Sequence, residues 1–384
     1  MWWLACAPEA PTPAPPTEDE VALEAGPIVV VTSPPEGHHH HHATVDWGEQ
    51  GALVAMVVGD EPATQVYALP LDDELAPDSP IAIARGDRPD VAWAEGRWVV
   101  AHDDAEGGIW LWPIAVDGGV GNGRELRQSP MLVEAVDLAV WSGGGAAIWT
   151  EAGGPGMAPD DGRIVARSFD TALEPVGDAL VLEDSRRTTS DAASRDGGWV
   201  GAWALHVPHP TIPGEVAYEA WAALMGEDGE ELRFRVDDLQ DRWPSRPAVA
   251  VTASGRLAVT FRDKTGSEGE SAGAWVRWFE PDGEPLGPSL DLDAGTGGNR
   301  VDVAAAGERV LCAWQQTEND GTIGVRVALV DPDGSVVAGP LALNEPGGDD
   351  DQRPSLSVRA TAAGWEAVVV WETAHGIRGR RVAW

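Results

Sequence analysis

The sequence predicts an all-β chain that folds as a seven-bladed β-propeller, with four antiparallel strands in each blade. Three observations predict this architecture: a degenerate repeat of roughly 50 residues, seven aligned repeat starts, and an unpaired apolar segment ahead of the first repeat. That segment would supply the strand that the last repeat lacks. Residues 1–26 are therefore assigned to an N-terminal tether and residues 27–384 to the propeller.

The start of each repeat carries an Arg-Pro-x-(Val/Leu)-(Ala/Ser) motif or a variant of it. The motif is clearest at residues 88–92, 246–250 and 353–357, and residues 300–304 are a variant. The aligned positions, here called the start residues, are His42, Arg88, Ala135, Thr189, Arg246, Arg300 and Arg353. Seven start residues predict seven blades.

A second strand, apolar and ending in an aromatic side chain, follows each start after a turn of small residues. The clearest copies are residues 146–149, 200–203, 258–261, 311–314 and 368–371, with Met56 and His102 at the same position in two weaker copies. Blades pack face to face, so one large flat side chain per blade fills the wedge between neighbours. This structural role explains the 19 tryptophans better than ligand stacking does.

A third strand follows a variable polar loop and ends in an acidic glycine turn. Asp228-Gly229, Asp282-Gly283 and Asp333-Gly334 show this turn best. Asp-Gly between apolar runs predicts a hairpin, because glycine accepts the positive φ that the turn requires. A short fourth strand, such as residues 340–343, then completes a four-stranded blade.

The last repeat reaches Trp384 after only three strands. Residues 27–32 read Pro-Ile-Val-Val-Val-Thr, which is apolar, β-branched and without a partner nearby in the sequence. Pairing these residues with the last repeat would close the ring and remove two exposed sheet edges. The sequence therefore predicts closure by an N-terminal strand.

The acidic composition limits the kinds of partner that the surface can bind. The formal net charge is −37 and the pI is about 4.3, so the surface repels phosphate backbones. This argues against nucleic acid and anionic membranes as partners, and no segment after the tether is long and apolar enough to span a bilayer. The chain has two cysteines, Cys6 in the tether and Cys312 in an apolar strand. Cys312 is therefore expected to be a buried free thiol.

The tether carries a second signal at its start. Leu4-Ala5-Cys6 resembles the end of a bacterial lipobox, in which Cys6 would be lipidated. The preceding segment is short and lacks the basic region and long apolar core of a signal peptide, so an upstream start codon or a chance match are the alternatives. Residues 7–26 are rich in Pro, Ala and Glu and predict an extended spacer. The localisation that follows is extracytoplasmic, with a lipid anchor at the cell envelope.

The repeat is similar to one found in many bacterial surface and secreted proteins that are taken to form propellers. The resemblance rests on the Arg-Pro start, the Trp-ended strand, the acidic glycine turn, and Leu343-Asn344 ahead of Gln352-Arg353-Pro354. It covers residues 240–384 well and the first half loosely. It implies the fold and the location, but no activity. The Ser-x-Asp-x-Gly-x-x-Trp boxes of sialidases and the signatures of WD40 repeats are absent.

Start residues are expected to surround one mouth of the central channel. The candidates for ligand binding there are His42, Arg88, Arg246, Arg300 and Arg353. Convergent guanidinium groups bind carboxylates bidentately, which predicts an anion or sugar-carboxylate site. The structural alternative, which we favoured, is that each arginine pairs with a blade carboxylate such as Asp103, Glu151 or Glu372 and holds the strands in register.

A run of five histidines lies between the closing strand and the first repeat. The run comprises His38, His39, His40, His41 and His42. Clustered imidazoles bind divalent zinc, nickel or copper, so a metal site at this run is a candidate, and no other cofactor is expected. A solvated low-complexity loop or an internal purification tag is the preferred alternative, because a run by itself fixes no ligand geometry.

Other polar segments give weaker signals. Asp349-Asp350-Asp351 and Asp331-x-Asp333-Gly334 lack the regular oxygen spacing of a calcium loop and are interpreted as turns. The loops at 151–162 and 206–215 are the most individual segments, and binding residues concentrate on such loops. No Ser or Cys carries a nucleophile motif, so no catalytic residue is nominated.

The function expected from the sequence is that of a non-enzymatic binding or interaction module, outside the cytoplasm, for a glycan, a peptide or a protein partner. The chain is expected to be a monomer. The alternative is a propeller-type polysaccharide hydrolase or lyase with carboxylates at the channel mouth. A scaffold without a small ligand is a third alternative, because the fold does not determine the function.

Overall fold

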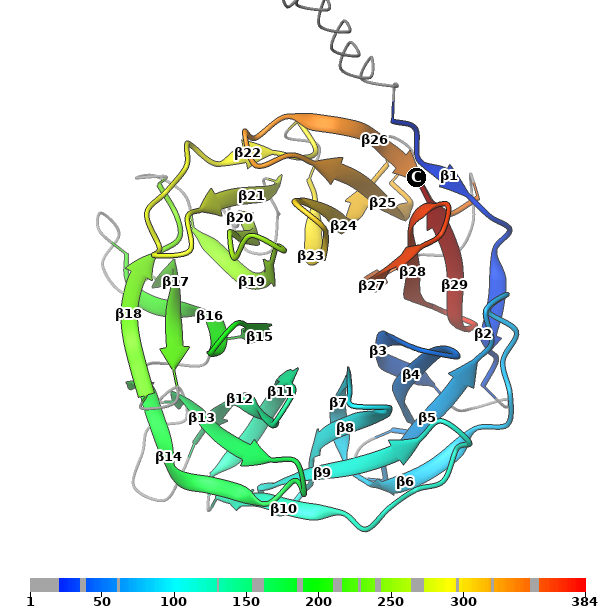
Figure 1. Cartoon of the computed structure of the whole chain (residues 1–384), viewed down its shortest axis with the longest axis vertical. Helices are drawn as coiled ribbons and strands as arrows, with labels where there is room; N and C mark the ends of the chain where they lie inside the picture. Colours follow the sequence, from blue (N-terminus) through cyan, green and yellow to red (C-terminus); the bar gives the residue numbers. More distant parts are fainter. Residues whose placement is uncertain are drawn as a thin grey trace, which may run out of the picture.

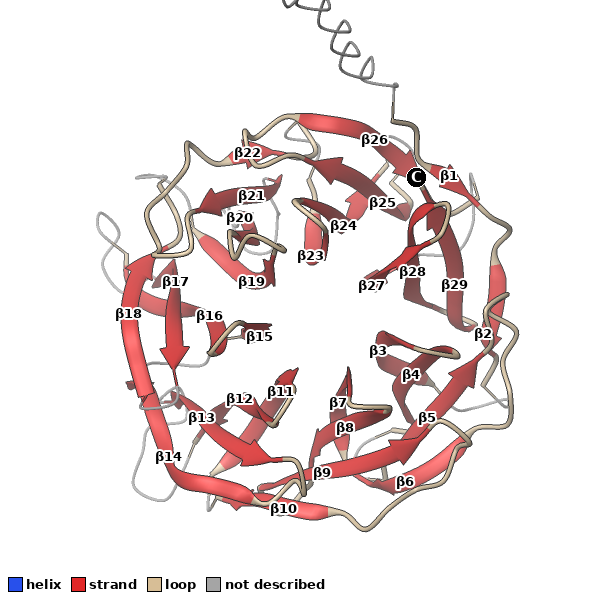
Figure 2. Ribbon diagram, in the orientation of Figure 1, coloured by secondary structure: helices blue, strands red, loops and turns tan. Residues whose placement is uncertain are grey.

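The structure is a computed structural model that describes residues 21–34, 39–60, 63–129, 131–153, 162–184, 189–209, 216–226, 229–238, 243–263, 273–294, 297–318, 321–345 and 352–384. Seven antiparallel sheets are arranged as the blades of a ring around a central channel (Figure 1). All regular elements of the described residues are strands (Figure 2). Accordingly, no helix in the described part of the chain could cross a membrane.

Each blade uses consecutive strands that run from the channel outward. Blade 1 comprises β3 (His40–Gly48), β4 (Gly51–Val58), β5 (Gln65–Leu71) and β6 (Ile81–Arg85). Blade 2 comprises β7 (Asp87–Ala94), β8 (Arg97–Asp103), β9 (Gly108–Ala115) and β10 (Arg124–Gln128). Blade 3 comprises β11 (Leu132–Trp141), β12 (Gly144–Ala152), β13 (Gly162–Asp170) and β14 (Pro175–Asp184).

The second half of the ring follows the same order. Blade 4 comprises β15 (Ser190–Arg195), β16 (Gly198–Pro208), β17 (Val216–Gly226) and β18 (Gly229–Arg235). Blade 5 comprises β19 (Pro244–Val251), β20 (Leu257–Asp263), β21 (Gly273–Phe279) and β22 (Leu290–Asp291). Blade 6 comprises β23 (Asn299–Ala306), β24 (Arg309–Thr317), β25 (Ile323–Val330) and β26 (Val336–Ala342). The predicted seven-bladed propeller is confirmed.

Blade 7 joins the two ends of the chain. Its own strands are β27 (Gln352–Thr361), β28 (Gly364–Thr373) and β29 (Gly376–Ala383). Its outer edge is β2 (Val29–Thr32), where Val29 pairs with Gly379, and β1 (Glu24–Ala25), where Glu24 pairs with Ala383. The predicted closure by an N-terminal strand is confirmed, because both short strands pair antiparallel with β29 and cover an otherwise open sheet edge.

Large side chains at the ends of the second strands fill the seams between blades. Trp149, Trp203, Trp314 and Trp371 are each 0–1% exposed. Trp314 of blade 6, for example, packs in one apolar cluster with Ala248 and Trp278 of blade 5. The predicted structural role of these tryptophans is confirmed, and removing such a ring typically costs about 3–5 kcal/mol. Cys312 lies in the same cluster as a buried free thiol, as expected.

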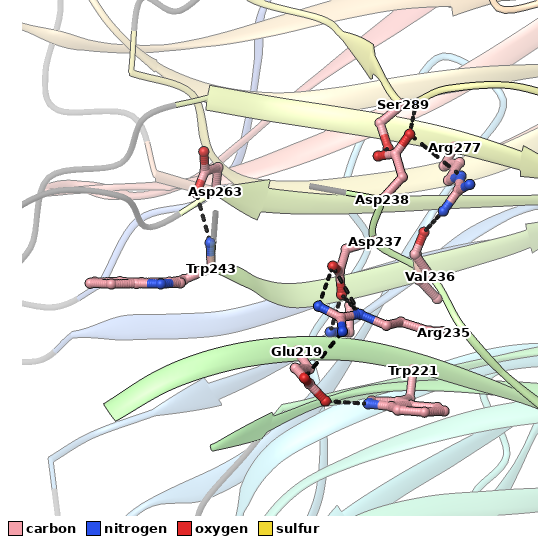
Figure 3. A network of polar contacts seen from close by, with 11 residues as sticks. Glu219, Trp221, Arg235, Val236, Asp237, Asp238, Trp243, Asp263, Arg277 and Ser289 are labelled. Carbon is pink, nitrogen blue, oxygen red and sulfur yellow. Dashed lines mark hydrogen bonds and ion pairs between the residues drawn. The ribbon is translucent and has the colours of Figure 1, made fainter. Parts of the chain in front are cut away.

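The outer parts of three seams are held by arginines of the third strand, here called the seam arginines: Arg167, Arg277 and Arg380. Arg277 of blade 5 donates from Nη1 to the carbonyl oxygen of Val236, beyond the outer strand of blade 4, at 2.8 Å (Figure 3). Its Nε donates to Gly287 O within its own blade at 3.2 Å. A seam arginine therefore ties two blades through carbonyl oxygens that would otherwise lack a donor.

Candidate functional site at the channel mouth

One cavity of about 750 Å³ opens at the channel and is lined by the start residues of all seven blades. Each blade contributes the beginning of its innermost strand, which lies nearest the channel axis in Figure 1. The predicted gathering of His42, Arg88, Arg246, Arg300 and Arg353 around one cavity is what the structure contains. Glu372 also lines this cavity.

A β-bulge places the start residues. Positive φ values of 43–61° occur at six of them: His42, Arg88, Ala135, Arg246, Arg300 and Arg353. The strand register shifts at the same points, for example between Asp87 and Asp90 and between Asn299 and Asp302. An extra residue in one strand breaks the strict alternation of side chains between the two faces. The bulge thus sets the direction of each start residue independently of the regular strand that follows.

Side chains next to the bulge bind its backbone. The Arg300 N–H donates to Asn299 Oδ1 at 2.9 Å, and the Arg88 N–H donates to Asp87 Oδ1 at 2.8 Å. In blade 1 the acceptor comes from blade 7, since the His42 N–H donates to Glu372 Oε1 at 2.6 Å. A left-handed conformation is disfavoured for arginine and histidine, and these hydrogen bonds help to hold it.

Several guanidinium nitrogens at the mouth lack partners. Arg246 Nη1 and Arg353 Nε are buried and have no hydrogen-bond partner among the described residues. The Arg300 guanidinium forms no hydrogen bond or ion pair with any described residue. A buried donor without an acceptor is unfavourable by about 1–3 kcal/mol, more when it is charged. The mouth therefore contains donors that an anionic ligand could satisfy.

Glu372 is the blade carboxylate that does face the mouth arginines. Its Oε1 lies 3.5 Å from Arg353 Nη1, at the limit of a weak ion pair. Burial first, and then the neighbouring Arg353 and Arg88, lower the pKa of Arg300 to about 10, although Glu372 acts in the opposite direction. The guanidinium groups thus raise the positive potential in one shared space.

The other two carboxylates named in the structural alternative are Glu151 and Asp103. Glu151 is fully buried and pairs with Arg127 at 2.8 Å and with Arg163 at 2.6 Å, neither of which is a start residue. Asp103 is buried, and its Oδ1 has no hydrogen-bond partner among the described residues. Burial first, and then Asp87, raise the pKa of Asp103 well above its usual value. Of the carboxylates proposed to hold the start arginines, Glu372 pairs with Arg353, and Asp103 lies near enough to Arg88 for the two charges to interact.

Deeper in the same cavity lies a ring of aspartates, here called the bridging carboxylates: Asp46, Asp90, Asp137, Asp191 and Asp302. Four accept a backbone N–H of the next blade, at 2.6 Å from Trp93, 2.8 Å from Leu138, 2.6 Å from Val249 and 2.8 Å from Leu356. Asp137 accepts from Ser190 Oγ of the next blade at 2.9 Å. These contacts connect successive inner strands around the channel.

Burial raises the pKa of every bridging carboxylate. The pKa of Asp46 and of Asp302 rises to about 6, and that of Asp90 to about 7, with backbone hydrogen bonds acting in the opposite direction. The pKa of Asp137 and of Asp191 is also raised, by burial first and then by neighbouring aspartates. The sequence analysis missed this ring, although Asp90, Asp137, Asp191 and Asp302 each follow a start residue by two positions.

The histidine run is divided by the structure. His39 supplies a carbonyl oxygen to the Gly59 N–H at 3.0 Å, and His40 Nδ1 lies 2.8 Å from Thr32 Oγ1 of the closing strand. His41 and His42 come together, with their Nδ1 atoms 3.2 Å apart. His38 lies outside the described residues, as do Cys6, residues 349–351 and most of the loop at 151–162.

Asp87 of blade 2 is the partner of His42, with Oδ1 2.9 Å from Nδ1. Burial alone would raise the pKa of Asp87, but the hydrogen bond with His42 and the nearby charges lower it to about 2. The pKa of His42 is lowered, mainly by burial, with the Asp87 hydrogen bond acting against that change. Asp87 is therefore a carboxylate at neutral pH, and it connects blades 1 and 2 at the mouth.

The loop at 206–215 is described as far as His209. His206 contacts Tyr218 edge-on with ring centroids 4.6 Å apart, and His209 contacts Trp243 edge-on at 4.8 Å. Nearby, Arg262 of blade 5 donates to Asn299 Oδ1 of blade 6 at 2.7 Å. Aromatic rings of blade 4 and a half-buried arginine of blade 5 thus lie close in the chain to Arg246.

Comparison with known proteins identifies the scaffold. No family model and no curated protein matches this sequence. The fold is similar to that of a protein of unknown function from Dyadobacter fermentans, with a TM-score of 0.55 and 10% identity over 94% of this chain and 99% of that chain. It is also similar to the β-propeller domain of the Trilobed protease from Pyrococcus furiosus, with a TM-score of 0.52 and 11% identity over 87% and 93%.

A third similar structure is the hemagglutinin-neuraminidase of parainfluenza virus 5, solved with the ligand DANA. The TM-score is 0.52, with 7% identity over 94% of this chain and 95% of that chain. At identities this low, the likeness concerns the fold alone. The chain is a β-propeller whose scaffold is shared with neuraminidase and peptidase propellers.

Proposed function

We propose that this protein is a binding module whose channel mouth holds an anionic ligand, the carboxylate of an acidic glycan. The observation that carries the proposal concerns one shared cavity. Buried guanidinium nitrogens of Arg246 and Arg353, and the whole guanidinium of Arg300, have no hydrogen-bond or ion-pair partner there among the described residues. Charge-assisted hydrogen bonds to a carboxylate are about twice as strong as neutral ones. A carboxylate would therefore satisfy donors that the protein leaves open.

The size and shape of the site support a sugar-sized ligand. A cavity of about 750 Å³ falls within the range of ordinary small-molecule sites. The parainfluenza virus 5 structure was solved with the ligand DANA, which supports the use of a propeller of similar extent to hold a small molecule. The net charge of −37 repels an anionic ligand at long range, so the proposal requires that local contacts with the mouth arginines select the ligand.

The test is binding of a panel of oligosaccharides, measured by calorimetry. Uronic-acid and sialic-acid oligosaccharides should bind, and neutral sugars of the same size should not. Arg246→Ala and Arg300→Ala should each weaken binding by about 10- to 100-fold, because each removes a charge-assisted hydrogen bond. Arg124→Ala is the matched control, since Arg124 pairs with Glu174 on the outer surface at 2.9 Å. Equal loss in the control, or binding of neutral sugars alone, would contradict the proposal.

A second candidate is a polysaccharide hydrolase or lyase. It is favoured by one observation, the carboxyl group of Asp90, which lines the cavity and has a pKa raised to about 7 by burial. A carboxyl group that is still protonated near neutral pH is suited to general acid catalysis. If the wild type cleaves a polysaccharide of a test panel and Asp90→Asn does not, the result would support this candidate over simple binding.

The proposed location is outside the cytoplasm, with a lipid on Cys6 and a spacer that ends before β1 (Glu24–Ala25), because β1 belongs to blade 7 and not to the tether. The Leu4-Ala5-Cys6 sequence and the proline-rich composition support it. Metabolic labelling with radioactive palmitate in a bacterial host tests it directly. Label should enter the wild-type chain and be absent from Cys6→Ser, and label in both chains would contradict a lipid at Cys6.

A further inference from the structure

Three side chains at the edge of the channel mouth converge on one point. They are His41 and His42 of blade 1 and Asp87 of blade 2, and their ligand atoms all lie within 4.8 Å of one another. The two Nδ1 atoms are 3.2 Å apart, and Asp87 Oδ1 is 2.9 Å from His42 Nδ1. Among the described residues, this is the one group of three or more His, Cys, Asp or Glu side chains that converges in this way.

The bulge of blade 1 makes this convergence possible. Consecutive side chains of a regular strand point to opposite faces, so adjacent histidines of a strand cannot reach one ion. His42 has a φ of 52°, and the register of β3 against β4 shifts between His41 and Thr44. The two imidazole rings consequently meet edge to face, with centroids 4.6 Å apart. The β-bulge recurs in the repeat, and in blade 1 it brings together two side chains that can bind a metal ion.

The hydrogen bonds indicate which nitrogens carry protons. His41 Nε2 lies 3.2 Å from the carbonyl oxygen of Gly59, which can only accept, so Nε2 carries the proton and Nδ1 presents a lone pair. That lone pair and Asp87 Oδ1 both face His42 Nδ1, which has one proton at most to donate. Two acceptors therefore compete for one hydrogen, whereas a cation bound by all three atoms would satisfy each of them.

The distances also suit an ion. In a tetrahedral site with bonds of about 2.0–2.1 Å, neighbouring ligand atoms lie about 3.3 Å apart. Two of the three separations, 3.2 and 2.9 Å, are close to that value, and the third, between His41 and Asp87, is within 4.8 Å. The hydrogen bond from His41 Nε2 to Gly59 O is the outer contact that usually orients a metal-binding histidine. Gly59 is itself held by the His39 carbonyl oxygen, at 3.0 Å from its N–H.

We propose that His41 Nδ1, His42 Nδ1 and Asp87 Oδ1 bind a divalent transition-metal ion of the zinc, nickel or copper class. Two imidazoles select such ions over calcium and magnesium, which prefer oxygen ligands. Three protein ligands leave a fourth tetrahedral position open, as in sites where a metal holds water or a ligand. His42 also lines the channel-mouth cavity, so the ion would add positive charge at its edge.

The proposal stands independently of anion binding, because metal binding is measured with no sugar present. It differs from a flexible histidine run in its prediction for Asp87, which lies 45 residues from His42 in the sequence and belongs to another blade. A flexible run would bind metal through any of its histidines. The proposed site requires His41, His42 and Asp87, and does not require His38 or His39.

The experiment titrates the full chain, purified without an added histidine tag, with Zn²⁺ in a calorimeter and with Co²⁺ in an absorption spectrometer. One ion per chain is expected, with the visible absorption of tetrahedral Co²⁺. His42→Ala and Asp87→Asn should each weaken Zn²⁺ binding at least 10-fold, and the double variant His38→Ala/His39→Ala should bind as the wild type does. Circular dichroism of each variant verifies folding.

Two results would overturn the site. One is unchanged Zn²⁺ affinity in both folded variants, Asp87→Asn and His42→Ala. The other is a loss of affinity in the His38→Ala/His39→Ala variant with no loss in Asp87→Asn, which would assign the binding to the histidine run alone. Failure to bind any ion at millimolar Zn²⁺ would exclude both readings of the cluster, and the anion site would remain testable with the sugar panel.

Discussion

Arginines occur in two regions of the repeat, on the third strands of blades 3, 5 and 7 and at the starts of blades 2, 5, 6 and 7, and the two sets behave differently. The seam arginines lie on the third strands, and their guanidinium groups meet carbonyl oxygens of two blades, as Arg167 does with Leu126 O at 2.7 Å and Gly177 O at 2.7 Å. The start arginines lie at the channel, where Arg246 Nη1 and Arg353 Nε are buried without a partner among the described residues. The fold thus satisfies donors of Arg167, but it leaves these donors of Arg246 and Arg353 without an acceptor among the described residues.

The difference shows that recurrence within a repeat does not by itself indicate a structural role. The seam arginines serve the repeat, because each supplies donors to the ends of neighbouring outer strands. The start arginines instead hold charge at a cavity, where Arg353 lies 3.5 Å from Glu372 and the charges of Asp87 and Asp103 act on Arg88. The repeated fold therefore builds two sets of arginines, and in the inner set Arg246, Arg300 and Arg353 keep donors without a partner among the described residues.

The largest expected effect that tests this comparison is on a seam. Arg277→Ala removes donors from Val236 O and Gly287 O, and the side chain is only 12% exposed. Losing charge-assisted hydrogen bonds and leaving carbonyl oxygens unsatisfied should lower the free energy of unfolding by about 3 kcal/mol. Urea denaturation measures the change. Sugar binding at 25 °C should be unaffected, and a stability loss below about 0.5 kcal/mol would remove the distinction between the two sets.

Much of the fold could be predicted because the repeat carries it. The Arg-Pro start, the Trp-ended strand and the Asp-Gly turn recur along the sequence. Each of them is recognised from a few neighbouring residues. Gly283 and Gly334, for example, have the positive φ values of 83° and 80° that their turns predict. The closing strand was also readable, since residues 27–32 are apolar and lack a local partner.

The site was predictable only in outline. The sequence placed the start residues around one mouth, but it could not say which arginines have partners. The partners come from other strands and in part from other blades: Glu372 on β28 lies 3.5 Å from Arg353 of its own blade and accepts the N–H of His42, 330 residues away. Asp87 is likewise separated from His42 by a blade boundary. The bridging carboxylates could have been predicted from their position two residues after a start residue, except for Asp46, which lies at a different distance from His42.

A medium effect concerns the layer beneath the start arginines. The pKa of Asp90 is raised to about 7, mainly by burial, so the native state binds a proton more tightly than the unfolded chain. This contribution to stability is complete below about pH 4 and is lost as the pH rises through about 7. Asp90→Asn stays neutral and still offers an oxygen to the Leu138 N–H.

Asp90→Asn should therefore flatten the pH dependence. At pH 8 the variant should be more stable than the wild type by about 1–2 kcal/mol. This is less than the full pKa shift would imply, because the carboxylate lines an open cavity where solvent screens its charge. At pH 4 the two proteins should be equal within about 0.5 kcal/mol. Urea denaturation at both pH values measures this. A wild type whose stability rises between pH 4 and pH 8 relative to the variant would contradict the raised pKa.

The smallest expected effect on the free energy of unfolding concerns the start arginines. Arg300→Met keeps the apolar stem and removes a half-buried guanidinium that has no hydrogen bond or ion pair with the described residues. Replacing a desolvated, unpaired charge by an apolar group of similar volume is often neutral or stabilising. The free energy of unfolding should therefore stay within about 1 kcal/mol of the wild-type value or rise, in contrast to Arg277→Ala, whereas sugar binding should fall. A loss of 2 kcal/mol or more would mean that Arg300 holds the blades together, and the channel-mouth arginines would then be structural after all.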